Sequence, residues 1–317
     1  MVTAKIPYSE FRGMKLSKLM LGTAQLGMSG YGVANRETHV DDRALLDRCR
    51  LHGVNCYDTA LEYGDAELKL GRYFEELGER PFLVSKLKTS LDLTNEAALE
   101  AEVRQKVETI LDRLRLNRLP ALMIHEPQVL SVYGDRLTGI VERLRREGLI
   151  ERAGLSLGAR PDVQYAECRT WLAHDIYELI QLPMNVWDRR VIACGALRQF
   201  REQEKLIVVR SVFLQGLFFH DGESLPAVLR ETAPQALARL RAFAEEEEGL
   251  SVAQLALSYI RDLEGVHTLV IGAETPDQID DNVRLLQGPA LSERTRDRVE
   301  RAFRDMPEAL ITPLLWK

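Results

Sequence analysis

Four side chains able to handle a proton lie at the ends of short segments of this chain. The segment 58–65 (DTALEYGD) places the carboxylate of Asp58 five positions before the phenol of Tyr63, whereas Lys86 and His125 each end an apolar run, FLVSK and ALMIH. A phenol is a weak acid at neutral pH, and a nearby ammonium lowers its pKa by favouring the phenolate. A carboxylate would keep that ammonium charged, and an imidazole could orient a substrate or relay its proton. Together, the four groups could protonate a carbonyl oxygen while a hydride is delivered to its carbon.

Each of these residues also has an ordinary structural interpretation. Asp58 could cap the turn that follows it, and Tyr63 could be a half-buried loop aromatic. Lys86 could extend its ammonium to solvent, and His125 could be a hydrogen-bonded core histidine. Their coincidence at the ends of neighbouring predicted strands favours one common site.

The elements that must position these residues alternate along the chain. Segments such as 102–114 (EVRQKVETILDRL) carry apolar residues at helical spacing and predict amphipathic helices. Between the helices, short aliphatic runs predict strands, and alternation of this kind indicates a parallel sheet buried on both faces. Eight units predict an α/β protein, a (β/α)₈ TIM barrel, whose strand ends meet at one mouth. The eight runs are 19–23, 54–58, 82–86, 121–125, 152–157, 177–183, 206–212 and 268–273.

Three stretches lie outside the eight units. Residues 6–18 predict an N-terminal hairpin that plugs the barrel floor, and 224–248 predict extra helical structure after the seventh strand. A further helical extension is expected at the C-terminus, which ends in the apolar segment 309–317 (ALITPLLWK). No run of Pro, Gly or Ser marks a linker, so residues 1–317 are predicted to form a single domain.

Two other architectures were weighed. A doubly wound dinucleotide fold would explain the four glycines of 22–32, but GTAQLGMSGYG has the spacing GxxGxG in place of GxGxxG, and the next helix is expected only near His39. A metal-dependent barrel hydrolase needs several His and carboxylate ligands at strand ends, whereas only His125 of the six histidines ends a predicted strand. No metal is therefore expected.

Composition restricts the partners. The net charge is −6, and Lys and Arg are scattered among acids, which argues against a nucleic-acid partner. No apolar run is long enough to span a membrane. The four cysteines form no CxxC pair and the first residues lack a signal-peptide core, so a cytoplasmic protein is expected. The oligomeric state stays open.

The pattern DTAxxYG, followed by Lys86 and His125 on the next two predicted strand ends, resembles the tetrad of the aldo-keto reductases. The similarity extends over nearly the whole chain, with further matches at 22–25 (GTAQ), 210–216 (RSVFLQG) and 272–282 (GAETPDQIDDN). The resemblance implies a metal-free enzyme that interconverts a carbonyl and an alcohol with NADP(H) or NAD(H). It implies that Tyr63 is the general acid, Lys86 its pKa modifier, Asp58 the partner of Lys86, and His125 the orienting group.

The resemblance also implies where the cofactor lies. Ser156 and Gln181 would hold the carboxamide, and Arg210 stands where the family places an aromatic that stacks on the nicotinamide ring, a role that a guanidinium plane can also fill. The loop from Ser211 to Gly216 would wrap the pyrophosphate. The full set of expected cofactor residues is Gly22, Thr23, Ser156, Gln181, Arg210, Ser211, Phe213, Leu214, Gly216, Gly272, Thr275, Gln278 and Asn282.

The choice of cofactor and substrate is left open by the sequence. The family commonly uses NADP(H), but residues 272–283 contain no Lys or Arg and four acids, which favours NAD(H) or mixed use. Similarity to a bacterial subgroup favours a small carbonyl, sugar or polyol substrate, with Gln25 donating hydrogen bonds and Trp187 offering a stacking surface. The alternative is a cofactor-binding sensor or auxiliary subunit with little turnover.

Overall fold

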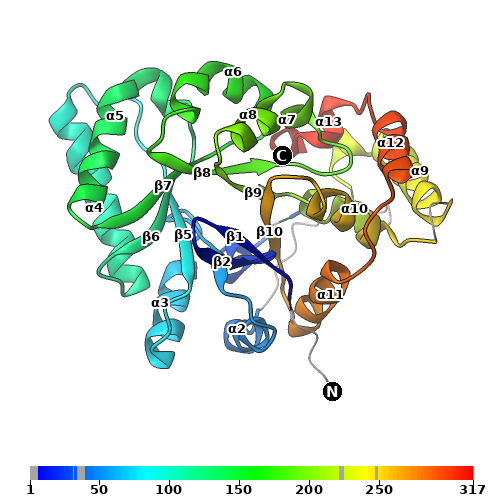
Figure 1. Ribbon diagram of the computed structural model, residues 1–317, viewed down its shortest axis with the longest axis horizontal. Coiled ribbons are helices and arrows are strands. Elements are labelled where there is room, and N and C mark those ends of the chain that lie inside the picture. Colours follow the sequence, from blue (N-terminus) through cyan, green and yellow to red (C-terminus); the bar gives the residue numbers. More distant parts are fainter. Residues whose placement is uncertain (1–5, 31, 34–39, 221–224, 247–248, 317) are drawn as a thin grey trace.

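The computed structural model describes residues 6–30, 32–33, 40–220, 225–246 and 249–316. All eight predicted strands form, and they close into a barrel in which every neighbouring pair is parallel (Figure 1). The strand order around the barrel is β10-β3-β4-β5-β6-β7-β8-β9. The strands are β3 Leu19–Gly22, β4 Cys56–Asp58, β5 Phe82–Leu87, β6 Leu119–Ile124, β7 Ile150–Ser156, β8 Tyr177–Pro183, β9 Leu206–Arg210 and β10 Val266–Gly272.

The strand register brings the predicted site residues to one end of the barrel. Gly22 is paired with Asp58 on one side and with Gly272 on the other, and Ser156 is paired with Gln181. Because all strands run in the same direction, the residues that end them share the carboxyl-terminal mouth, where barrel enzymes place their chemistry.

Helices surround the barrel and bury one face against it. In α4, for example, the buried positions Leu99, Val103, Val107 and Ile110 recur every three or four residues, which is the pattern that predicted a helix over 102–114. The surrounding helices are α2 Asp42–Leu51, α3 Ala66–Leu77, α4 Glu96–Leu114, α5 Val129–Arg146, α6 Pro161–Leu172, α7 Arg190–Ala193, α8 Ala196–Glu202, α10 Val252–Arg261 and α11 Pro276–Leu286. Helix α2 begins after the cap residue Asp41, and His39 lies outside the described residues.

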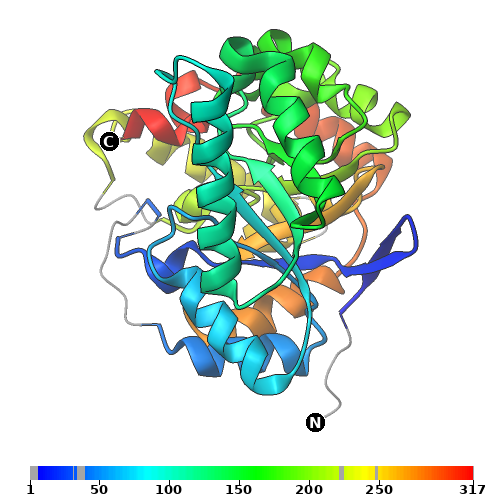
Figure 2. The ribbon, with the colours of Figure 1, turned by 90° about the vertical axis from the view of Figure 1, so that its left-hand side faces the viewer.

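The predicted hairpin is present and plugs the floor of the barrel. It consists of β1 Tyr8–Phe11 and β2 Met14–Ser17, joined by Arg12 and Gly13 with φ of 46° and 80°. Phe11 and Leu16 are buried in a cluster with inward-facing strand residues such as Met20 and Val84. Figure 2 shows this hairpin at one end of the molecule and the C-terminal end of the chain at the opposite side.

The predicted additions to the barrel are also present. After β9 come the 3₁₀ turns η1 Leu214–Phe219 and η2 Ala227–Leu229 and the helix α9 Ala233–Glu246. The chain ends with α12 Glu293–Ala302, α13 Glu308–Ile311 and η3 Pro313–Trp316, and a short helix α1 Ala24–Gly27 follows β3. Among the residues described, no helix is both long and apolar enough to cross a bilayer.

Candidate active site

A buried ion pair lies at the base of the mouth. The Nζ atom of Lys86 is 2.7 Å from Oδ2 of Asp58, and their side chains are 0% and 4% exposed. Lys86 also donates a hydrogen bond to the carbonyl of Thr59 at 2.9 Å. Desolvation of a lone ammonium here would be costly, so the neighbouring carboxylate keeps Lys86 charged and fixes its direction. The contact expected from the sequence between these two residues is therefore present.

Tyr63 lies beside this pair and beside His125. Its ring centroid is 5.2 Å from the Nζ atom of Lys86 and 6.0 Å from the imidazole centroid, and the two rings are nearly perpendicular, at 80°. Burial raises the pKa of the phenol, the charge of Asp58 raises it further, and Arg210 opposes both. The phenol therefore retains its proton at neutral pH, and its pKa is not lowered in the way that the neighbouring ammonium led us to expect. The second cation near this phenol, Arg210, was predicted only as a cofactor residue.

Two glycines hold the backbone of Tyr63 in place. Gly27 ends α1, and a methyl group added to it would overlap the carbonyl oxygen of Tyr63. Gly64 has φ of 57°, and a methyl group added there would overlap the carbonyl of Gly27. The phenol therefore depends on a close approach of two backbones that only glycine permits.

His125 contacts an acid that the sequence analysis did not single out. Its Nδ1 atom is 2.9 Å from Oε2 of Glu62, the residue before Tyr63. Burial lowers the pKa of His125, and the hydrogen bond to Glu62 opposes this effect. The sequence shows that Glu62 lies in the same loop as Tyr63. It does not show the direction of the Glu62 side chain.

A chain of buried hydrogen bonds connects four strand ends. Gln181 donates from Nε2 to Oδ1 of Asp58 at 2.6 Å, and Ser156 donates to Oε1 of Gln181 at 3.2 Å. Thr23, which is fully buried, donates its hydroxyl to the carbonyl of Asp58 at 2.9 Å. The ion pair is thus surrounded by Thr23, Ser156 and Gln181. Asp58 accepts hydrogen bonds from Thr23 and Gln181, and Ser156 in turn holds Gln181.

The loop after β9 has an unusual backbone. Ser211, Leu214 and Gln215 have φ of 63°, 49° and 54°, and Gly216 has φ of 87°. Left-handed conformations at non-glycine residues are strained, and a group of them close together is a feature found at functional sites. Turns of this kind direct successive backbone N–H groups into concavities that bind anions. An anionic group bound here would contact the backbone of the loop, since the side chain of Leu214 itself is buried.

Two side chains secure this loop. Arg210 donates to the hydroxyl of Ser211 at 3.1 Å and to the carbonyl of Leu157 at 2.9 Å. Asn185, which is fully buried and which the sequence analysis missed, donates to the carbonyl of Ser211 at 3.2 Å. Phe213 is partly exposed beside them. The first residue of the loop is therefore fixed from two neighbouring strand ends.

The end of β10 and the start of α11 form another part of the mouth. Gln25 lies across Gly272, because a methyl group on Gly272 would overlap the carboxamide of Gln25. Thr275 caps α11 by accepting from the Gln278 amide, and Gln278 accepts from the Glu274 amide at 2.7 Å. In a capping box, the glutamine side chain would accept from the backbone amide of the N-cap residue, Thr275. Gln278 accepts instead from the amide of Glu274, the residue before Thr275.

The charges at α11 are partly balanced. Asp280 is paired with Arg48 and His52, and Asp281 with Arg284. Asn282 is mostly buried in the helix. The acidic character at the N-terminus of α11 therefore depends mainly on Glu274 and Asp277.

Trp187 is not presented to the mouth. It is 2% exposed, with its ring centroid 4.9 Å from that of Phe218 and 6.5 Å from that of Phe303. Because the side chain is almost fully buried among these rings, it offers no stacking surface to a substrate.

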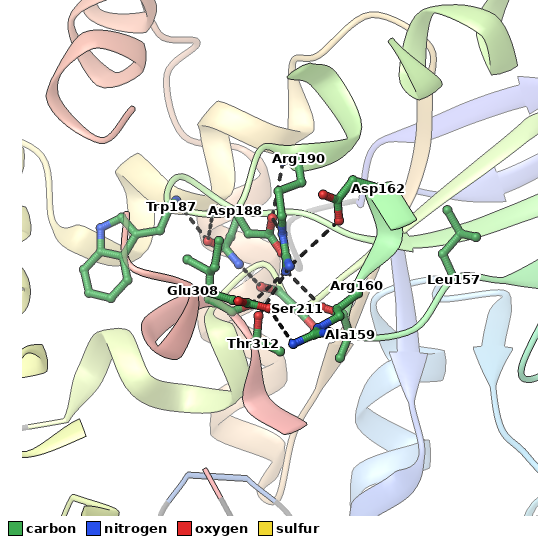
Figure 3. Close-up of polar contacts among 12 residues, drawn as sticks. Leu157, Ala159, Arg160, Asp162, Trp187, Asp188, Arg190, Ser211, Glu308 and Thr312 are labelled. Atoms are coloured by element: carbon green, nitrogen blue, oxygen red, sulfur yellow. Dashed lines mark hydrogen bonds and ion pairs between the residues drawn. The ribbon is translucent and has the colours of Figure 1, made fainter. Parts of the chain in front are cut away.

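An arginine network connects the C-terminal segment to the mouth (Figure 3). Arg190 donates to Asp188 at 2.7 Å, to the carbonyl of Ala159 at 3.0 Å and to the hydroxyl of Thr312 at 3.3 Å. Glu308 forms an ion pair with Arg160 at 3.0 Å. The loops after β7 and β8 are thus joined to α13 and η3. Over the described part of the chain, no group of three or more His, Cys, Asp or Glu side chains is arranged to hold a metal.

Comparisons with known proteins agree with this geometry. The sequence profile of the Aldo/keto reductase family matches residues 18–303. Aldo-keto reductase YhdN of Bacillus subtilis is 25% identical over 290 residues, 84% of each chain. The NADH-specific methylglyoxal reductase of Escherichia coli is 22% identical, with 93% of this chain and 96% of the relative covered.

Among solved structures, the holo form of aldo-keto reductase AKR11C1 from Bacillus halodurans has the same fold. Its TM-score is 0.74 at 20% identity, over 94% of this chain and 96% of the other. The names of these proteins are those of enzymes and give no support to a sensor. The chain therefore belongs to the aldo/keto reductase family and is an oxidoreductase that interconverts a carbonyl and an alcohol with a nicotinamide cofactor.

Proposed function

We propose that Tyr63 is the general acid and base of this enzyme, with Lys86, Asp58 and His125 as its supporting groups. The observation that carries the proposal is the buried Lys86–Asp58 pair, 2.7 Å apart, with the phenol over the ammonium at 5.2 Å. The bound cofactor supplies or accepts a hydride at the substrate carbon. In reduction, the Tyr63 hydroxyl gives its proton to the carbonyl oxygen, and in oxidation the phenolate takes the hydroxyl proton back.

We propose that the cofactor lies across the mouth from β7 to α11. Ser156 and Gln181 lie where the carboxamide would bind, Arg210 beside the nicotinamide, and the loop Ser211–Gly216 around the diphosphate. The left-handed backbone of that loop is the feature that fits an anionic group. The further residues proposed to line this path are Gly22, Thr23, Phe213, Leu214, Gly272, Thr275, Gln278 and Asn282.

We infer a preference for NAD(H) over NADP(H). Segment 272–283 offers no basic side chain to a 2′-phosphate, and Glu274 and Asp277 would repel it at the start of α11. The E. coli relative is named as NADH-specific, which supports the same choice. A small hydroxylated carbonyl, sugar or polyol is the proposed substrate, and Gln25, partly exposed beside Gly272, is proposed to contact it.

Tyr63→Phe tests the chemistry and the cofactor preference in one series. Titration of protein fluorescence with NADH and with NADPH should show tighter binding of NADH, and the variant should bind both as the native protein does. Reduction of glyceraldehyde should fall by roughly 10²- to 10⁴-fold, the usual contribution of a general acid.

The matched control is Tyr8→Phe, which removes a hydroxyl from the floor hairpin, where it donates to the Gly53 carbonyl. That variant should keep full activity. Full activity of Tyr63→Phe would refute the assignment of the acid, and much tighter binding of NADPH would refute the cofactor preference.

A further inference from the structure

The carboxylate of Glu62 is anchored on both oxygens. Oε2 lies 2.9 Å from Nδ1 of His125, and Oε1 accepts from the backbone amide of Lys88 at 3.2 Å. Glu62 belongs to the loop after β4, His125 ends β6, and the Lys88 amide follows β5 between them. The contact with His125 is therefore held from a third strand and is not an incidental meeting of two side chains.

The protonation state of this pair follows from its surroundings. Burial raises the pKa of Glu62, but the hydrogen bond from His125, the charge of His125 when it is protonated, and the Lys88 amide outweigh it and hold the pKa below its usual range. An ionised carboxylate only accepts hydrogen bonds, so Nδ1 of His125 must be the donor.

The surroundings of the imidazole favour its neutral form, which carries one proton. Burial lowers the pKa of His125, and the charges of Lys86 and Lys88 lower it too, against the opposing effect of Glu62. Around the ring, Lys86 is paired with Asp58, and Lys88 is 2.5 Å from Glu126. A neutral ring whose single proton is on Nδ1 has a lone pair on Nε2, the nitrogen that points away from Glu62.

We propose that Glu62 is a positioning residue that makes His125 a hydrogen-bond acceptor towards the substrate, so that the enzyme selects a hydroxyl next to the reacting carbon. The inference rests on the function proposed above, in which His125 orients the substrate. A carbonyl oxygen carries only lone pairs and is repelled by the lone pair of Nε2. A neighbouring hydroxyl can donate to Nε2, while Tyr63 donates to the carbonyl oxygen. α-Hydroxy carbonyls and vicinal diols are therefore the substrate class that this site recognises.

The tautomer can be measured without turnover. In protein labelled with ¹⁵N-histidine, the ring nitrogens of His125, assigned with His125→Gln, should show the proton on Nδ1. Glu62→Gln should keep this tautomer, because its amide oxygen still accepts from Nδ1. Glu62→Leu should move the proton to Nε2, and Glu126→Gln, which removes the charge of the neighbouring acid paired with Lys88, should leave the tautomer unchanged. A proton on Nε2 in the native protein would overturn the proposal.

Selectivity gives the second measurement. The ratio of kcat/KM for glyceraldehyde to that for propanal compares an aldehyde with and without the neighbouring hydroxyl. Glu62→Leu should lower this ratio by roughly 3- to 10-fold, the factor that one neutral hydrogen bond contributes. Glu62→Gln should restore most of the ratio, and in the His125→Gln background the Glu62→Leu change should have no further effect.

The outcomes separate this proposal from the proposed function. The role of Glu62 would be overturned if Glu62→Leu left the kcat/KM ratio unchanged. It would also be overturned if Glu62→Leu lowered that ratio equally in the His125→Gln background. Either result would leave Tyr63 as the acid. An active Tyr63→Phe variant would overturn the chemistry and leave the tautomer measurement valid.

Discussion

Asp58→Asn changes the charge of the buried ion pair and little else. The new amide oxygen can still accept from Lys86. Gln181 can then rotate its own amide, so that its oxygen accepts from the asparagine and its nitrogen donates to Ser156, which already lies 3.2 Å away. Every hydrogen bond of the network is retained, and the only loss is the negative charge beside the ammonium.

The cost follows from the burial of Lys86. Its side chain is 0% exposed, and a buried charge that loses its partner destabilises a protein by about 3–5 kcal/mol. For a chain of 317 residues, with an unfolding entropy of about 0.7 kcal/mol/K, the melting temperature should fall by roughly 4–7 °C. Urea denaturation measures the free energy directly. Combining the change with Lys86→Met removes both charges and should recover most of the loss.

Two results would refute this reasoning. A loss below about 1 kcal/mol in Asp58→Asn would mean that the ammonium is not desolvated, since exposed pairs contribute that little. A double variant as unstable as the single one would mean that charge is not the cause. The control is Glu76→Gln, which breaks the exposed pair with Arg43 and should leave stability unchanged.

Two other substitutions test the surroundings of the phenol. Gly27→Ala should displace Tyr63 and lower kcat by at least about tenfold with NADH affinity unchanged, because small misplacements of a reacting group are costly. The control is Gly139→Ala, where an added methyl group has room. Equal kcat values in the two variants would contradict the positioning role of Gly27. Burial raises the pKa of Glu67 from 4.5 to about 7, so the folded state retains a proton that the unfolded chain releases, and stability should fall as pH rises through that range. Between pH 5 and 8, Glu67→Gln should reduce the fall in the free energy of unfolding by up to about 3 kcal/mol, as measured by urea denaturation. Identical pH dependence in the native protein and the variant would contradict this prediction.

The barrel was predictable because its signals are local and repeated. Each strand is a short aliphatic run between helices of regular spacing, and the closed parallel topology then forces the strand ends to one mouth. Asp58, Lys86 and His125 could be placed together from that rule alone. The hairpin was predictable for a similar reason, since Arg12-Gly13 separates two short runs that both carry inward-facing apolar residues.

Loop residues were less predictable because their contacts depend on distant parts of the chain. Trp187 follows a strand end and could have faced the mouth, but Phe303 from the C-terminal region covers it. Asn185 holds the carbonyl of Ser211, and no spacing in the sequence signals that bond. Gln278 was expected as a cofactor residue, and its contact with the Glu274 amide depends on how the chain turns into α11.

Barrel closure has a consequence for how the chain is made. The first barrel strand, β3, is paired with the last, β10, and the floor hairpin is bonded to the same late segment, where Ser9 donates to the His267 carbonyl and Thr268 to the Ser17 carbonyl. During synthesis, the N-terminal elements emerge first, and β3 can pair with β4, but its other edge has no partner until residues 266–272 leave the ribosome. Closure is therefore a late step in which the two ends of the barrel sheet meet, and termination before β10 leaves an open sheet with two exposed edges.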